Sequence, residues 1–397
     1  MNLLKEMLST SATKAFLSIV IGFFVGALFM MVSSEAVGEA WRSGGLFDAF
    51  QAALQVAADG YGALFRGAVF NTRADDLVTA LRPLTETFRL AGPLIAAGLG
   101  ISLGFRVGLF NIGGNGQMIF GILWATWVST RVELPPILHI LVAVVVAILG
   151  AALWGALVGF LKAQTGAHEV ILTIMLNYVA ISLFTWFIRS PELLQNPDAG
   201  GTPKSDAPFE TAQLPALFPG TYSLHVGFIL AILATLTYWW LMERSTIGYR
   251  FRMVGQNPHA ARTAGISVER TYVWAMAASA AFVGVAGANQ ALGTQVGYTE
   301  TIHAGIGFDG ITVALLGGGN AVGIFFAGLL FGAFKAGGPQ MQVLGVSPEV
   351  LGIVQGAIVL FIAAPPLVRA IFRLPVMRQT PLLDAVRAKF SRKESSV

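Results

Sequence analysis

Residues 244–272 read RSTIGYRFRMVGQNPHAARTAGISVERTY and lie between two long apolar runs, 225–242 and 271–292. Each run is close to the roughly 20 residues that a helix needs to cross a bilayer. The polar stretch between them carries five arginines, Arg244, Arg250, Arg252, Arg262 and Arg270. Cationic connections between spans stay on the cytoplasmic side. We therefore expect 243–270 to be a cytoplasmic loop, and its side of the membrane orients the other spans.

The centre of this loop has the signals of a short helix. Asn257 is a good N-cap, Pro258 suits the first helical position, and Gly265 is suited to end the helix. The helix formers between them are Ala260, Ala261 and Ala264. A short capped helix with small side chains, on the inner face of a membrane protein, would fit a soluble partner. The alternative interpretation is an ordinary connecting loop.

The composition is that of an integral membrane protein. Of the 397 residues, 55% are hydrophobic and 12% are charged, whereas a soluble domain averages about 25% charged residues. The absence of cysteine excludes disulfides, thiolate catalysis and most zinc sites. No Gly-Lys pair occurs, so the chain lacks a Walker A loop, and any ATP that drives it must be bound by another subunit. The net charge of +4 does not indicate nucleic acid, because the basic residues lie in loops and at the C-terminus.

Ten apolar runs predict the membrane spans. The first, 15–32, competes with a signal peptide, but it is long for one and no clear cleavage site follows it. The other runs are 88–108, 109–129, 136–161, 167–189, 225–242, 271–292, 306–318, 320–337 and 348–372. The sequence predicts an all-α integral membrane protein: one transmembrane domain over 1–397, with about ten spans in two related halves and a broken helix in each half.

The polar segments divide between the two sides of the membrane. Segment 33–87 is too polar to span, and we expect it to form short helices on the outer surface. Segment 190–224 is proline-rich and forms a second outer loop. The basic tail, 374–397, and the N-terminus are assigned to the cytoplasm by the positive-inside rule.

The first predicted helix break lies between two apolar runs. Residues 110–117 read FNIGGNGQ, with three glycines and the amide side chains of Asn111, Asn115 and Gln117. Broken backbone at membrane depth is tolerated only where it is buried in protein or faces a water-filled cavity, and it often marks a transport path. Amides suit a polar, neutral solute. The alternative is a tight turn whose amides only satisfy backbone groups.

The second predicted break is the segment 305–312, GIGFDGIT, followed by ALLGGGN. Asp309 is the clearest acid near membrane depth, and an acid there is a functional candidate. Its position before Gly310 also makes it a natural N-cap, and we favour this role. The two breaks occupy corresponding positions in the two halves, which indicates an internal repeat.

Other polar residues fall within or near the spans. Asn177 and Tyr178 lie in 167–189, and Asn289 and Gln290 lie near the outer end of 271–292. Each pair could line a pore or join helices. The five histidines have no metal-binding spacing, and no catalytic set is recognisable. We therefore predict neither a metal site nor an enzyme.

Three motifs carry a resemblance to a known family: GLFNIGGNGQMIFG (108–121), VGQNPHAARTAGISVER (254–270) and GIGFDGITVALLGG (305–318). They resemble permease subunits of ATP-binding-cassette (ABC) importers, in the branch for sugars, branched-chain amino acids and nucleosides, and most resemble bacterial nucleoside permeases. The resemblance runs from about Tyr61 to the last span. Many relatives carry an acid where this chain has Asn115, and that departure leaves the solute open.

The resemblance implies a fold, partners and site residues. In this family, two permeases pair around a central path and each docks a cytoplasmic ATPase, which binds ATP and magnesium. The coupling helix seated in the ATPase would be Asn257, Pro258, Ala260, Ala261, Ala264 and Gly265. The segment Phe110 to Gln117 would lie near the path. With the polar candidates above, the predicted path residues are Phe110, Asn111, Asn115, Gln117, Asn177, Asn289, Gln290, Phe308 and Asp309.

The resulting hypothesis is a permease in a bacterial cytoplasmic membrane, which receives a nucleoside from an extracytoplasmic binding protein. It would contain no cofactor of its own, and its pair would be a related but different chain. One alternative is the same class of importer for a simple sugar such as ribose or galactose. Another is an ion-coupled secondary transporter, for which only Asp309 could supply the coupling carboxylate.

Overall fold

The computed structural model describes residues 11–218, 220, 222–293 and 297–372, and in these residues every regular element is a helix. Two are short 3₁₀ turns, η1 (Pro197–Ala199) and η2 (Glu210–Ala212). The α-helices are α2 (Ser11–Ser33), α3 (Glu35–Ala68), α4 (Leu77–Arg106), α5 (Gly114–Arg131), α6 (Pro136–Thr165), α7 (Glu169–Arg189), α8 (Gly227–Arg244), α9 (Thr246–Gln256), α10 (Pro258–Thr263), α11 (Val268–Leu292), α12 (Ile306–Leu316), α13 (Ala321–Val343), α14 (Glu349–Ala363) and α15 (Pro365–Ile371). The predicted tail, 374–397, lies outside the described residues.

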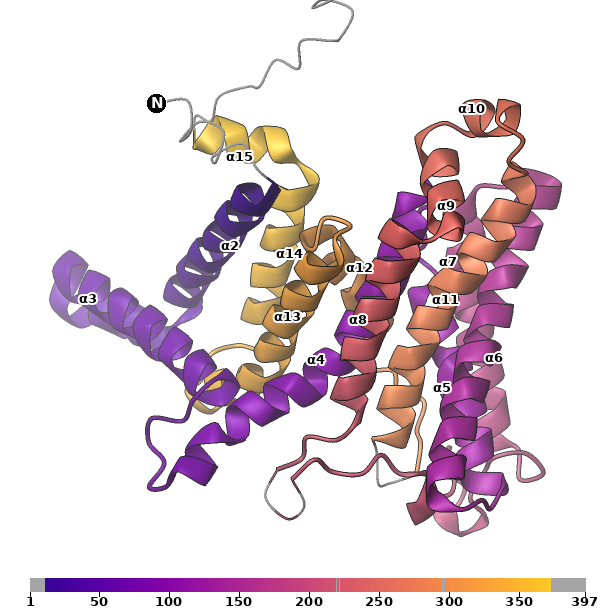
Figure 1. Ribbon diagram of the computed structural model, residues 1–397. Coiled ribbons are helices and arrows are strands. Elements are labelled where there is room, and N and C mark those ends of the chain that lie inside the picture. Colours follow the sequence, from indigo (N-terminus) through magenta and orange to yellow (C-terminus); the bar gives the residue numbers. More distant parts are fainter. Residues whose placement is uncertain (1–10, 219, 221, 294–296, 373–397) are drawn as a thin grey trace, which may run out of the picture.

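Ten of these helices correspond to the ten predicted runs: α2, α4 to α8 and α11 to α14. Six described helices (α2, α4, α6, α7, α11 and α13) are long and apolar enough to cross a membrane, and α12 and α14 are shorter apolar helices. Helices α5 and α8 run alongside the long ones (Figure 1). The prediction of an all-α membrane protein is confirmed.

Helices α4 and α11 form the centre of the bundle, because small residues let neighbouring backbones approach them closely. A Cβ on Gly100 of α4 would meet the Ser279 carbonyl and Val283 of α11. Gly155 of α6 also packs against α11, at Met276 and Ala280. Such contacts hold helices together in lipid, where hydrophobic burial between helices gives little drive.

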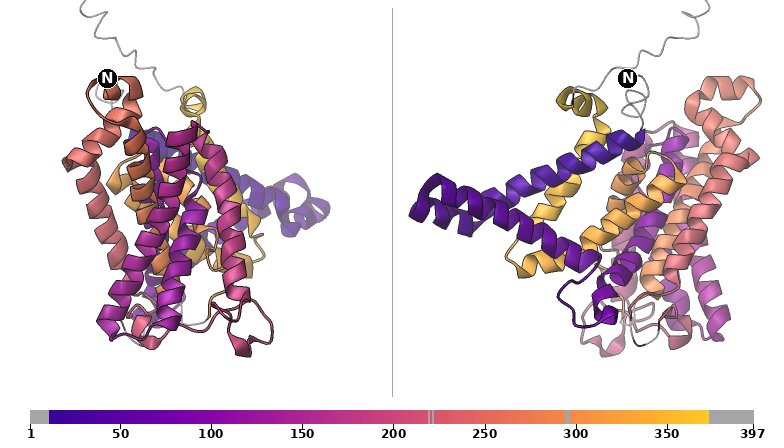
Figure 2. Two further views of the ribbon diagram at one scale, coloured as in Figure 1. Left: turned by 90° about the vertical axis from the view of Figure 1, so that its right-hand side faces the viewer. Right: turned by 60° about the vertical axis from the view of Figure 1, so that its left-hand side comes forward.

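The segment 33–87 differs from its prediction of short helices. Most of it is one long helix, α3, interrupted at Gly45 (φ 80°) and extending away from the bundle in both views of Figure 2. Helix α4 already begins at Leu77, where the Asp76 carboxylate accepts the Thr79 N–H (3.0 Å). Hydrogen bonding to Thr79 lowers the pKa of Asp76 from its ordinary value. Helix α3 is stable despite its many polar residues because its small residues pack against α2 and α13.

The last predicted span, 348–372, is also divided in the structure. Helix α14 ends at Ala363, and α15 begins at Pro365. Two consecutive prolines, Pro365 and Pro366, favour a break here, because a proline lacks an N–H and its ring clashes with the preceding turn of a helix. Helix α15 and the beginning of α2 lie at the same end of the molecule as α10, and the segment between α7 and α8 lies at the opposite end (Figure 1).

Candidate functional site

The first break is a non-helical turn, 107–113, held together by Asn111; the end of the predicted segment 110–117 is already helical, because α5 begins at Gly114. The Asn111 Nδ2 donates to Gln117 Oε1 (3.1 Å) and to Ser279 Oγ (2.9 Å). Its Oδ1 accepts from the Gly113 N–H (2.9 Å) and from Gln117 Nε2 (3.2 Å). Asn111 and Gln117 are fully buried. The two side chains therefore satisfy the loose backbone and one another.

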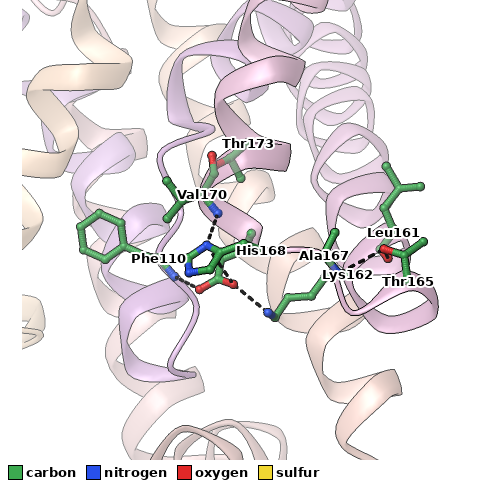
Figure 3. A network of polar contacts seen from close by, with 9 residues as sticks. Phe110, Leu161, Lys162, Thr165, Ala167, His168, Val170 and Thr173 are labelled. Carbon is green, nitrogen blue, oxygen red and sulfur yellow. Dashed lines mark hydrogen bonds and ion pairs between the residues drawn. The ribbon is translucent and has the colours of Figure 1, made fainter.

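Helix α7 supplies the remaining partners of this turn. Asn177 accepts from the Gly116 N–H (2.8 Å) and donates to the Ile112 carbonyl (3.0 Å). The Glu169 carboxylate accepts from the Phe110 N–H (3.4 Å) and from Lys162 Nζ (2.7 Å). Figure 3 shows the Phe110 nitrogen and the Lys162 side chain approaching this carboxylate. The turn is thus fixed to α7 at two levels.

The two predicted breaks meet at Asn115. A Cβ on Gly307, the second residue of α12, would overlap the Asn115 backbone, and one on Gly114 would lie 2.9 Å from the Gly307 carbonyl oxygen. Asn115 is 1% exposed, and no donor in the described residues reaches its Oδ1. The glycines at both positions are required for this close approach.

The predicted bounds of the second break, 305–312, are wrong, because residues 306–312 are helical. The break precedes α12, which begins after Gly305 in the left-handed region (φ 71°). The prediction that Asp309 caps this helix is wrong, because the N-cap is Gly305 and Asp309 is the fourth helical residue. Its carboxylate instead pairs with Lys335 of α13 (2.8 Å), whose Nζ also donates to the Ala304 carbonyl (3.3 Å). Both charged side chains are about one-quarter exposed, and Phe308 beside them is 48% exposed.

The two polar residues near the end of α11 join neighbouring segments. Asn289 is buried, and its Nδ2 donates to the Gly227 carbonyl at the start of α8 (2.7 Å). Gln290 Nε2 donates to the Ile302 carbonyl (3.1 Å) in the segment before α12. Both side chains therefore support the end of the bundle opposite α10.

The loop that carries α10 has the predicted local geometry. The Asn257 Oδ1 accepts the N–H groups of His259 (2.9 Å) and Ala260 (3.1 Å), and Pro258 is the first helical residue. Gly265 follows the helix with φ 81°, where side chains are disfavoured. Ala261 is buried, whereas the other predicted coupling residues, Asn257, Pro258, Ala260, Ala264 and Gly265, are exposed.

This loop rests directly on the first break. A Cβ on Gly255 of α9 would overlap the carbonyl oxygen of Arg106, the last residue of α4. Gly108, with φ 78°, approaches Gly255 from the turn itself. The α10 loop is therefore in backbone contact with the residues that precede Asn111.

The comparisons with known proteins agree with this architecture. Residues 84–363 match the family described as the branched-chain amino acid transport system permease component. The chain belongs to this permease family. The guanosine ABC transporter permease protein NupP of Bacillus subtilis is 37% identical over 89% of this chain and 93% of its own length. The nucleoside ABC transporter permease protein NupB of Lactococcus lactis is 31% identical over 94% and 96%.

A third relative of the permease is named for a sugar. The glucose ABC transporter permease protein TsgB13 of Haloferax volcanii is 32% identical over 77% of this chain and 80% of its own length. No solved structure gives a significant match. As a member of this family, the permease is a non-enzymatic, multi-pass membrane component. In the described residues, no three His, Cys, Asp or Glu side chains gather as a metal site.

Three residues of the permease site escaped the sequence interpretation: Ser279, Lys162 and Glu169. Ser279 accepts from Asn111 and donates to the Gly100 carbonyl (2.6 Å), which joins α4, α11 and the first break. A serine inside an apolar run gave no signal of this partner. Lys162 and Glu169 did give one, since they are opposite charges on either side of the turn between two apolar runs.

Proposed function

We propose that the chain is the permease subunit of a binding-protein-dependent ABC importer for nucleosides. The observation that carries this proposal is α10, an exposed, capped helix between α8 and α11, in a chain similar over nearly its whole length to permeases named for guanosine and nucleosides. Membership of the family implies an ATPase and a binding protein as partners. In this proposal α10 seats in the ATPase, which binds ATP and magnesium, and this chain binds no cofactor.

The translocation path, in this proposal, runs beside the two breaks and is completed by a second, related permease. Phe110, Phe308 and Asp309 supply partly exposed side chains there. Asn111, Gln117 and Asn177 hold the first break, and Asn115 packs against Gly307 of α12. Asn289 and Gln290 hold the outer ends of the helices. This chain makes and breaks no covalent bond, and binding of ATP in the partner changes which side of the path is open.

We further propose a bacterial cytoplasmic membrane with both termini in the cytoplasm. In support, the beginning of α2 and α15 share the end of the molecule that carries α10 (Figure 1), and α10 lies in the loop 243–270 with its five arginines. The polar segment 190–224 then faces the binding protein, on the outside. The positive-inside rule gives the same orientation.

Two alternatives are separable from this proposal. A simple sugar as solute is favoured by the relative named for glucose. An ion-coupled transporter needs an uncommitted carboxylate at membrane depth, and the ion pair of Asp309 with Lys335 counts against it.

Reconstitution in vesicles tests the proposal. The chain is co-purified with its endogenous partners, placed in vesicles with ATP inside, and supplied with the binding protein and labelled guanosine, uridine, ribose, galactose or glucose. We expect uptake of a nucleoside that requires both ATP and the binding protein and persists with a protonophore. Preferred uptake of a sugar would replace the solute. Transport by this chain without any companion protein would overturn the proposal.

A further inference from the structure

Arg106, the last residue of α4, lies where three separate segments meet. Its Nη1 donates to Glu243 Oε1 (2.7 Å) and to the Gly319 carbonyl (3.0 Å). Its own carbonyl is covered by Gly255 of α9. One guanidinium can serve both acceptors, because it presents five N–H donors in a fixed planar fork.

The first of these segments leads directly into the α10 loop. Glu243 lies in the last turn of α8, and the single residue Ser245 separates α8 from α9. Ser245 is the N-cap of α9, and its Oγ accepts from the Gly248 N–H (2.9 Å). No flexible linker therefore separates α8 from α9. A displacement of α9 and α10 therefore reaches Glu243 within a few residues.

The second segment is the turn between α12 and α13. Gly319 is held there in the left-handed region (φ 76°), and its carbonyl also accepts from the buried Tyr238 hydroxyl (3.3 Å). Below the turn, α12 is one short helix of 11 residues, about 16 Å long at 1.5 Å per residue. Its other end carries Gly307, which packs on Asn115 of the first break.

The Arg106 contact has room to change. The pair borders a cavity of about 530 Å³, lined also by Trp239 and Asn320. The Arg106 and Glu243 side chains are 25% and 43% exposed, so the ion pair contributes little to folding stability. The pair therefore serves to position α8 relative to the turn at Gly319 and contributes little to holding the fold together.

We propose that Arg106 is the positioning residue that carries movement of the α10 loop to α12, and so to the contact between the two breaks. The inference rests on the proposed function of α10 as the coupling helix. Through its bond to Glu243, Arg106 follows α8 and α9. Through its bond to the Gly319 carbonyl, it moves the turn that follows the C-terminal end of α12. Without Arg106, the partner ATPase still hydrolyses ATP, but hydrolysis no longer efficiently changes which side of the translocation path is open.

The test compares ATP hydrolysis with uptake in the reconstituted complex. In Arg106→Gln, we expect the ATP hydrolysed per nucleoside imported to rise about fivefold or more, with unchanged subunit assembly. Glu243→Gln leaves the bond from Arg106 to the Gly319 carbonyl intact, so it should raise the ATP hydrolysed per nucleoside by less. Arg106→Lys should give a ratio between those of wild type and Arg106→Gln. The charge swap Arg106→Glu with Glu243→Arg restores the attraction but cannot donate to Gly319 from position 106, so it should remain uncoupled.

Arg131 provides a matched control. It too is the last residue of a helix (α5), pairs with a carboxylate (Asp206, 3.3 Å) and donates to a carbonyl (Leu193, 3.0 Å), but at the end opposite α10. Arg131→Gln should leave the ratio at the wild-type value. An unchanged ratio in Arg106→Gln, or full recovery in the charge swap, would overturn the proposal. If the Arg106→Gln complex fails to assemble, Glu243→Gln becomes the test, and a wild-type value of the ATP hydrolysed per nucleoside in that variant would overturn the proposal.

The outcome is distinguishable from failure of the proposed function. A wild-type complex that imports no nucleoside refutes the function before any variant is compared. A wild-type complex that imports nucleoside, with Arg106→Gln equally well coupled, refutes only the role of Arg106.

Discussion

The first break keeps its polar groups inside the protein, whereas the second carries an ion pair at its surface. Around the first, Asn111, Gln117 and Asn177 are buried and bonded to the turn or to one another. At the second, Asp309 and Lys335 are about one-quarter exposed, and the backbone relies on left-handed Gly305. Buried, satisfied networks rigidify a structure. In the proposed coupling, the first break is therefore the fixed joint and the second is the part that moves against it.

The contact between the breaks offers the largest effect. In Gly307→Ala the added methyl group would overlap the Asn115 backbone, and we expect a loss of stability of about 3 kcal/mol. Thermal unfolding of the purified chain in detergent measures it. Gly352→Ala is the control: it also lies in the first turn of a helix, α14, but a Cβ there meets nothing within 4 Å. Equal stability of the two variants would show that the breaks do not pack together.

The next effect probes the fixed joint itself. Asn111→Ala leaves the Gly113 N–H and the Gln117 amide without their buried partner, and we expect it to cost about 2 kcal/mol. Asn71 makes the corresponding bond to the Arg73 N–H (3.1 Å) in a more exposed loop, so Asn71→Ala should change stability by less than about 0.5 kcal/mol. If both variants unfold at the wild-type temperature, the first break is not a joint that depends on Asn111.

The difference between these regions also explains what the sequence could predict. The order of the spans follows from long apolar runs, and α10 follows from local chemistry: the Asn257 cap, Pro258 and left-handed Gly265 are all within one short segment. Glycine indicates roughly where both breaks lie, although the helices that follow begin earlier than predicted, at Gly114 and Ile306. These features depend on near neighbours in the chain, which a sequence displays directly.

The contacts that define the site depend on distant residues, and they were not predictable. Nothing near Asn111 indicates Ser279, and nothing near Gly307 indicates Asn115. Asp309 was misassigned as a cap because Gly305 starts α12 earlier than the side-chain pattern suggests. Helix α3 was missed because its polar residues hid a seam of small buried residues, Ala49, Ala53, Ala57, Gly60, Ala63 and Gly67.

A third variant tests whether the proposed movement of the second break originates in the α10 loop. Gly265→Val forces a β-branched residue into the left-handed region at a local cost of about 1–2 kcal/mol. If α10 is the coupling helix, we expect the partner ATPase to keep hydrolysing ATP while nucleoside uptake is lost, because the distorted loop no longer fits the ATPase. Gly166→Val imposes the same strain after α6 (φ 68°), with open space around it, and should retain coupling. Unchanged uptake in Gly265→Val would count against α10 as the coupling helix.

The smallest effect tests whether the second break faces water. If Asp309 and Lys335 line an aqueous path, their ion pair behaves as an exposed one, and Asp309→Asn should lower stability by about 1 kcal/mol or less. The pair of Arg131 with Asp206 is similarly exposed outside the spans, so Asp206→Asn should give an equal shift of the unfolding temperature. A loss of several kcal/mol in Asp309→Asn alone would mean that Lys335 is left unpaired in a low dielectric. The second break would then face lipid, and the path would have to lie elsewhere.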